Sequence, residues 1–166
     1  MKPKIIVAIL VALAVSLIAL QMQGRDERAI RRQFKELVRL CEKRPGQGML
    51  RSIAGAGDIR GYFTSNAVIQ LGRPYPLRPT PRELAALVAR VHVEIESLSI
   101  AVHGVEFLPL TESDAREFRT AVELKAVRQG RSESHLDEYR LRWEREDGEW
   151  RIAAARADST IQAADW

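Results

Sequence analysis

An uncharged hydrophobic run opens the chain and differs from the rest of the sequence. Residues 5–20 hold no charged side chain, and Ser16 is the one polar residue among them. A helix satisfies its own backbone hydrogen bonds in hydrocarbon, and about 20 residues span a bilayer. The sequence therefore predicts a transmembrane helix, with a membrane anchor over residues 1–24, lipid contact through residues 5–23 and a domain over residues 25–166.

A cleaved secretory signal is the competing interpretation of this run. Cleavage needs small residues at the −3 and −1 positions, and neither Ala19-Leu20-Gln21 nor Gln21-Met22-Gln23 fits. We therefore favour an uncleaved single-pass anchor. Lys2 and Lys4 favour a cytoplasmic N-terminus, whereas the arginines directly after the run favour the opposite orientation. We expect the domain on the non-cytoplasmic side, periplasmic or extracellular, because a signal-like start normally exports the domain attached to it.

After residue 25 the apolar positions first have a helical period. They predict a helix over about 26–43, which Pro45-Gly46 ends. Short helices are expected over 49–54 and 59–63, then a short strand over 67–71 and a proline-rich loop. The apolar positions of the first helix are Ile30, Phe34, Leu37, Val38 and Cys41.

The next helix carries a clear start signal. Thr80 is an expected N-cap, Pro81 the first helical residue, and Glu83 lies three residues after the cap. This arrangement predicts a capping box, in which the two side chains pair otherwise free N–H groups. An apolar stripe from Leu84 to Ile95 comes after it.

From Leu98 onward the pattern changes to a period of two, typical of strands. Asp147-Gly148 predicts a two-residue hairpin turn. That turn would place Trp143 opposite Ile152, Leu141 opposite Ala154 and Glu144 opposite Arg151. Helices followed by long antiparallel strands predict an α+β domain of about three helices packed on one face of a curved antiparallel sheet.

The charge distribution of the domain argues against a nucleic-acid partner. Lysine and arginine number 26 against 22 acidic residues, and without Lys2 and Lys4 the balance is 24 against 22. Acids and bases alternate through the domain, without a basic stripe interleaved with aromatics, so we expect no nucleic-acid partner. The arginines at 25, 28, 31 and 32 either meet anionic lipid head groups or form a solvated helix face. A single cysteine, Cys41, forms no internal disulfide.

The order of elements resembles the nuclear transport factor 2-like superfamily, whose cone-shaped fold includes ketosteroid isomerase and SnoaL-like polyketide cyclases. The resemblance covers about residues 26–159. It rests on the long first helix, the segment from Gly57 to Phe63, the capped middle helix and the hairpin from Trp143 to Ile152. Membership would admit a homodimer through the exposed sheet face. The superfamily is functionally diverse, so the resemblance implies a fold and no single activity.

Isomerase chemistry of this superfamily needs a carboxylate base with a tyrosine and a protonated aspartate. The resemblance implies that Asp58 lies in the region where the superfamily has its base, but the first helix holds no tyrosine. No catalytic residue is assigned; the candidates are Asp58, with a helix cap as the structural alternative, and His92, with a boundary residue as the structural alternative. Tyr62, His92 and Tyr139 are the candidates for lining a ligand pocket.

We expect no cofactor and no metal. His92, His103 and His135 lack the spacing of metal ligands. The segment Gly55–Gly61 has the glycines of a dinucleotide loop without the βαβ unit that such a loop needs.

The sequence leaves two functions open. The first is a membrane-tethered, non-catalytic interaction or scaffold module with protein partners in an envelope assembly. Its layout resembles the inner-membrane component of type IV secretion systems. The alternative is a binder, isomerase or lyase that acts on a small hydrophobic molecule in the cone cavity.

Overall fold

The computed structural model describes residues 24–72, 77–110, 112 and 114–158. The predicted lipid-contacting segment, residues 5–23, lies outside this part. In the part of the chain that is described, no helix combines the length and the apolar character that crossing a bilayer requires.

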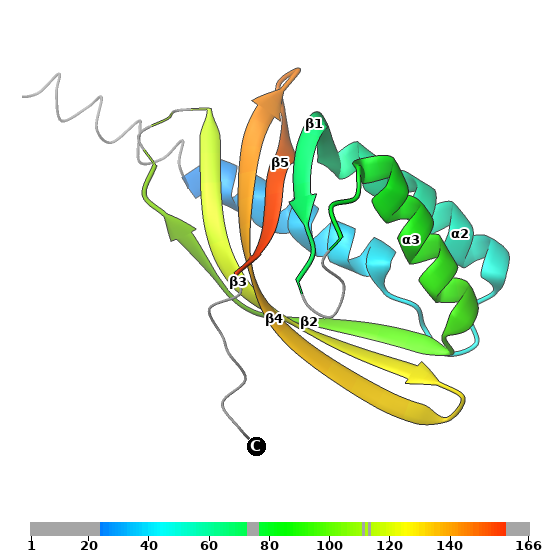
Figure 1. Cartoon of the computed structure of the whole chain (residues 1–166). Helices are drawn as coiled ribbons and strands as arrows, with labels where there is room; N and C mark the ends of the chain where they lie inside the picture. The colour runs from blue at the N-terminus through cyan, green and yellow to red at the C-terminus, as the bar shows by residue number, and fades with distance from the viewer. Residues whose placement is uncertain (1–23, 73–76, 111, 113, 159–166) are drawn as a thin grey trace, which may run out of the picture.

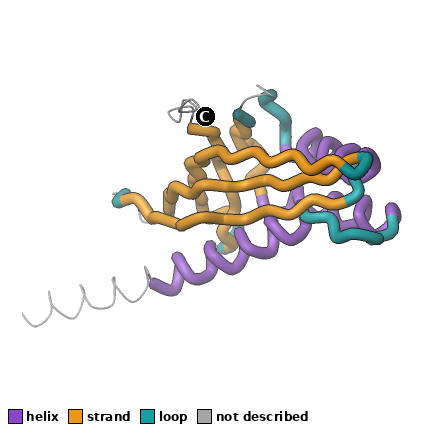
Figure 2. Tube along the Cα trace, turned by 90° about the horizontal axis from the view of Figure 1, so that it is seen from below, coloured by secondary structure: helices purple, strands orange, loops and turns teal. Residues whose placement is uncertain are grey.

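Helices cover one face of a strongly curved sheet (Figure 1). The first helix, residues 24–41, runs along the sheet (Figure 2). In chain order the remaining elements are α2 (Met49–Asp58), the 3₁₀ helix η1 (Ile59–Tyr62), β1 (Phe63–Gln70), α3 (Pro81–Glu94), β2 (Ser97–Leu108), β3 (Ala115–Arg128), β4 (Arg131–Glu146) and β5 (Glu149–Asp158). This is the predicted α+β arrangement of helices packed on a curved sheet.

The sheet is mixed, which corrects the prediction of an antiparallel sheet. Its strand order is β1-β5-β4-β3-β2, and β1 pairs in parallel with β5, with Phe63 opposite Ile152 and Ile69 opposite Ala155. The other neighbours are antiparallel. An alternating pattern shows that a strand has two faces, but it carries no information on the direction of its neighbour. The path of the chain through the helices sets the direction of β1.

The closing hairpin confirms the predicted turn and two of the predicted pairs. Asp147 and Gly148 have φ values of 53° and 81°, as a tight two-residue turn requires. Trp143 lies opposite Ile152, and Glu144 lies opposite Arg151. A bulge after Arg142 shifts the register, so Leu141 lies opposite Ala155 and not Ala154. Ala155 consequently packs against the core.

Aromatic side chains fill the space between the first helix and the sheet. The ring centroids of Phe34 and Phe118 are 5.2 Å apart, those of Phe107 and Phe118 5.5 Å, and those of Phe118 and Trp143 6.3 Å. Phe118 and Trp143 are fully buried, as is Ile30 on the first helix. Contacts of this kind stabilise beyond the area they bury. The interior of the cone is therefore used for packing.

The predicted capping box of α3 is present. The Glu83 amide donates to the Thr80 hydroxyl at 3.3 Å, and the Thr80 amide donates to the Glu83 carboxylate at 2.7 Å. These bonds from Thr80 also hold the pKa of Glu83 below its usual value.

Helix α2 is longer than the sequence predicted. It runs on to Asp58 because Ser52 and Ala56, each 1% exposed, let its backbone lie close to the rest of the domain.

Candidate functional site

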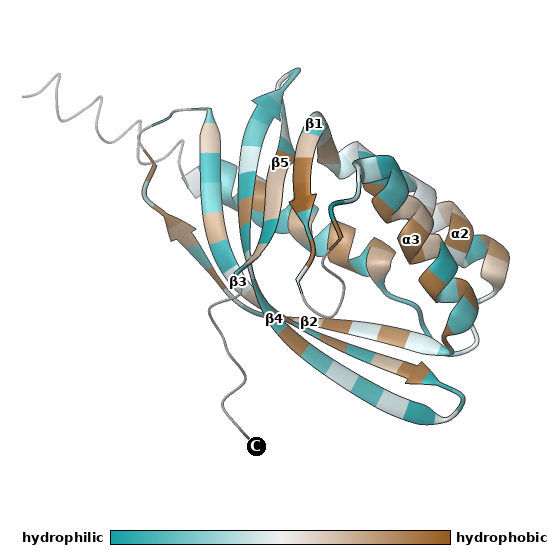
Figure 3. Ribbon diagram, viewed as in Figure 1, coloured by the Kyte–Doolittle hydropathy of each residue, from teal (hydrophilic) through white to brown (hydrophobic). Residues whose placement is uncertain are grey.

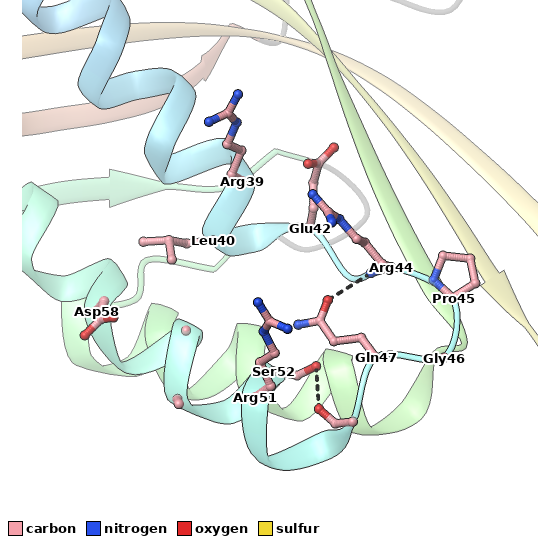
Figure 4. A pocket seen from close by; sticks show the side chains of 13 residues that line it. Arg39, Leu40, Glu42, Arg44, Pro45, Gly46, Gln47, Arg51, Ser52 and Asp58 are labelled. Carbon is pink, nitrogen blue, oxygen red and sulfur yellow. Dashed lines mark hydrogen bonds between the residues drawn. The ribbon is translucent and has the colours of Figure 1, made fainter.

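A groove of about 670 Å³ lies where the first helix ends and α2 begins (Figure 4). The end of the first helix, the turn after it and one side of α2 form its walls. The lining residues are Arg39, Leu40, Glu42, Arg44, Pro45, Gly46, Gln47, Gly48, Arg51, Ser52, Ala54, Gly55 and Asp58.

The local sequence builds this groove by reversing the chain in a tight turn. The helix ends at Cys41, Pro45 lies in the turn that follows, and Gly46 adopts a φ of 74°, which favours glycine. The Gln47 amide donates to the Arg44 carbonyl at 3.1 Å, and the Arg44 amide donates to the Gln47 side chain at 3.1 Å. The turn is thus closed in both directions, and α2 starts beside the helix that precedes it.

Lys43 fixes the base of the turn. Its ammonium group donates to the carbonyls of His92 and Ile95, each at 2.6 Å, at the end of α3. A cation is favourable there because the last carbonyls of a helix carry partial negative charge. The backbones of Lys43 and Leu98 exchange two hydrogen bonds of 2.9 Å, and Glu42 accepts from the Ile100 amide at 3.1 Å. The turn is therefore attached to both α3 and β2.

His92 has a structural position and is not part of the groove wall. It is 1% exposed, and its Nε2 lies 2.8 Å from the Cys41 carbonyl oxygen. Because a carbonyl only accepts, Nε2 carries the proton and donates. The ring thus joins α3 to the end of the first helix. Burial, and secondarily the Glu42 carboxylate, raises the pKa of the Cys41 thiol to about 12.

Asp58 is the one sequence candidate that lies in the groove wall. It is exposed and ends α2, but its side chain caps neither α2 nor η1. Tyr62 and Tyr139 pack against the core instead. Burial, followed by the carboxylates of Glu36 and Asp58, raises the pKa of Tyr62.

The pKa of Tyr139 is raised to about 12 by burial and then by Asp137. The structure does not bring Tyr62, His92 and Tyr139 together around the groove.

The three histidines have separate partners. His103 lies 3.2 Å from a Glu123 oxygen, and His135 lies 2.9 Å from an Asp137 oxygen. Over residues 24–72, 77–110, 112 and 114–158 the structure holds no group of three or more His, Cys, Asp and Glu side chains arranged for a metal ion.

The groove wall holds three arginines against two carboxylates, Glu42 and Asp58. Arg39, Arg44 and Arg51 are exposed, and none of their guanidinium groups has an acidic partner within the described residues. Helix α2 begins here without a side-chain cap and without an acid in its first turn, so its free N–H groups add to the positive potential. The arrangement can bind anionic groups such as phosphate or carboxylate.

The sequence alone did not predict this site because its arginines come from three separate segments. Arg39 lies in the last turn of the first helix, Arg44 lies in the turn and Arg51 belongs to α2. The one readable signal was the helical spacing of Arg32, Lys35 and Arg39.

Comparison with solved structures identifies the fold. A scytalone dehydratase-like protein from Novosphingobium aromaticivorans matches with a TM-score of 0.69 at 9% identity, covering 86% of this chain and 89% of that one. An NTF2-like protein with a cystatin-like fold from the same organism matches with a TM-score of 0.66 at 15% identity, covering 90% and 92%. This chain has a nuclear transport factor 2-like fold.

An enzyme with the same fold is also among the matches. A hexachlorocyclohexane dehydrochlorinase, LinA type 2, matches with a TM-score of 0.62 at 13% identity, covering 82% of this chain and 86% of that one. No family model and no curated protein matches the chain. At these identities the similarity to solved structures shows a shared fold, and activity has to be argued from the residues.

Proposed function

We propose that this chain is a membrane-tethered, non-catalytic interaction module of an envelope assembly. The observation that carries the proposal is the use of the cone for packing. Phe34, Phe118 and Trp143 fill the space between the first helix and the sheet. His92, a buried candidate, lies outside the groove wall, and its Nε2 donates to the Cys41 carbonyl.

One further observation supports the proposal. The uncharged run over residues 5–20 supports the tether, which would hold the domain on the non-cytoplasmic side.

The test is the state of the full chain after mild detergent extraction from its own membranes. We expect a defined complex, either with a stoichiometric protein partner or as a homodimer, by size-exclusion chromatography with light scattering. Recovery as a monomer without a stoichiometric partner would contradict the scaffold role. Release of the chain from membranes by alkaline carbonate would contradict the tether.

A binder or enzyme for a small hydrophobic molecule is the second candidate. The comparisons favour it, because named neighbours of the same fold include a dehydrochlorinase and a dehydratase-like protein. Asp58 in the groove wall is the residue that would serve it. A thermal-shift screen of hydrophobic ligands tests this candidate: a ligand whose stabilising effect is lost in Asp58→Ala would favour it, and a screen without such a ligand would count against it.

A further inference from the structure

The first helix carries a stripe of unpaired basic side chains on its outer face. We define the basic stripe as Arg25, Arg28, Arg32, Lys35 and Arg39, all exposed. At 100° per residue these positions fall within an arc of about 80°, and the arc is centred roughly opposite the face that buries Ile30, Phe34 and Leu37. None of the five has an acidic partner within the described part of the chain. The stripe therefore contributes no ion pair to the described part of the fold.

The groove continues this stripe onto α2. Arg39, the last residue of the stripe, and Arg51 of α2 both line the groove, with Arg44 between them on the turn (Figure 4). Glu42 and Asp58 also line the groove, and Glu42 accepts from the Ile100 amide, so three arginines face two carboxylates there. A band of positive charge thus runs from the start of the first helix to the first turns of α2.

Next to Arg51, α2 presents large apolar side chains to solvent. Leu50 is 86% exposed, Met49 56% and Ile53 42%, while the inward positions of this helix are the small residues Ser52 and Ala56. Figure 3 shows hydrophobic positions on this helix beside hydrophilic ones. The usual arrangement of a surface helix is thereby reversed, with its bulky apolar residues facing outward.

We propose that the basic stripe, the groove arginines and the apolar end of α2 form one surface that docks on an anionic lipid bilayer. Basic residues that flank exposed Leu and Met side chains are typical of helices at a bilayer interface, where apolar groups enter the head-group region and cations meet lipid phosphates. The stripe begins at Arg25, directly after the hydrophobic run, so the proposed tether would hold it near the lipid. From Arg25 to Arg39 it is about 21 Å long, at 1.5 Å per residue.

This inference rests on the proposed membrane tether and adds the orientation of the domain on the membrane. The domain would lie along the membrane through its helices, with the outer part of the sheet directed away from the lipid. An acidic protein partner would also meet the stripe. The hydrophobic run beside the stripe and the exposed Leu50 favour lipid.

A probe on α2 tests the docking surface in the full chain. Leu50→Cys is labelled with an environment-sensitive fluorophore in a Cys41→Ala background, so that the label is confined to position 50. The chain is reconstituted into vesicles of phosphatidylcholine alone, or with about one third phosphatidylglycerol, a mixture chosen for its negative surface potential. We expect a blue shift and quenching by membrane-embedded quenchers in the anionic vesicles, both reduced at high salt. The same probe at Leu136→Cys on β4 stays in a polar environment in both.

Two triple variants separate the effect of the basic stripe on docking from the effect of net charge. Arg28→Ala/Arg32→Ala/Lys35→Ala should lower the docked-to-undocked ratio about fivefold per residue, on the order of a hundredfold in all. Arg82→Ala/Arg128→Ala/Arg131→Ala removes the same charge elsewhere and should leave docking unchanged.

A Leu50 probe with the same signal in neutral and anionic vesicles would overturn the proposal, as would equal effects of the two triple variants. Flotation of the chain with the vesicles in high salt reports on the tether separately. A chain that floats while its probe stays polar retains the tether and loses the docking surface. A chain that does not float loses both.

Discussion

Two arginines of the sheet and the basic stripe of the first helix differ in how their charges are paired. On β3 and β4, Arg116 and Arg145 lie 3.4 and 2.6 Å from oxygens of the Asp26 carboxylate. The Arg145 guanidinium also stacks 4.8 Å above the centre of the Trp150 ring. By contrast, Arg28 and Arg32 on the first helix have no acidic partner within the described residues. Arginine forms internal ion pairs at these positions of the sheet, whereas on the outer face of the first helix it has none within the described residues.

The contrast separates charged residues that join layers of the domain from those that have no partner within it. Asp26 lies on the first helix but meets the sheet, and it also accepts a hydrogen bond from the Trp150 indole at 3.3 Å. It therefore joins two layers of the domain. A basic residue that no acid neutralises within the domain remains available for a partner outside it, and the basic stripe consists of such residues.

Removing Asp26 should give the largest effect. Asp26→Ala leaves two guanidinium groups and the Trp150 indole without their shared acceptor in a partly buried place. We expect a loss of about 2–3 kcal/mol in the free energy of unfolding. Urea denaturation measures it, with Asp26→Asn as the milder control. A loss below about 0.5 kcal/mol, the usual size for a surface substitution, would mean that these pairs do not hold the layers together.

Lys43 lies in the turn and forms hydrogen bonds within the domain, so its replacement should give the second largest loss of stability. Lys43→Met keeps most of the side-chain volume and removes the donor to the carbonyls of His92 and Ile95. The expected cost is about 1.5–2 kcal/mol in unfolding free energy. Lys125→Met, at an exposed ion pair with Glu123, is the matched control and should cost at most about 0.5 kcal/mol. Equal costs for the two variants would show that the hydrogen bonds of Lys43 stabilise the fold no more than an exposed ion pair does.

Acid should weaken the sheet pairs and spare the stripe. Hydrogen bonds from Lys125 and then His103 lower the pKa of Glu123 in the folded state. The resulting stability is complete above the unfolded pKa of about 4.5 and is lost as pH falls through the folded value. We expect Glu123→Gln to flatten the pH dependence of urea unfolding in this range. An unchanged slope would contradict the assigned pair.

The smallest effect on folding should come from the stripe itself. Arg28→Ala/Arg32→Ala/Lys35→Ala should change the unfolding free energy by no more than about 0.5 kcal/mol per site, because these side chains have no partner to lose and like charges four residues apart repel. Urea denaturation in detergent measures it. A loss comparable to that of Asp26→Ala would place the stripe among the residues that hold the fold.

The elements that sequence predicted well are those with local signals. The capping box at Thr80 and the turn at Asp147-Gly148 involve residues at most three apart, so their chemistry is visible in the sequence. The parallel pairing of β1 with β5 and the bulge after Arg142 depend on distant segments, and alternation encodes neither. Asp58, the candidate in the region of the superfamily's base, is exposed in the groove wall at the end of α2, which extends farther than the sequence predicted.

For the basic stripe and His92 too, the sequence shows local spacing but not long-range contacts. The spacing of the basic stripe is present in the sequence, but its significance depends on which arginines find partners, and only the folded chain shows that. His92 could be placed on a helix from its spacing, whereas its bond to the Cys41 carbonyl is a contact across 51 positions.

The most direct test of the central claim compares two lysines of the unmodified chain. Lys35 belongs to the stripe, and Lys125 on β3 is 57% exposed. Full-length protein in neutral and in anionic vesicles is treated with an uncharged amine-reactive ester, and modification of each lysine is quantified by mass spectrometry. A docked stripe predicts that Lys35 becomes protected in anionic vesicles while Lys125 reacts equally in both. Equal reactivity of Lys35 in the two vesicles would show that the stripe does not face lipid.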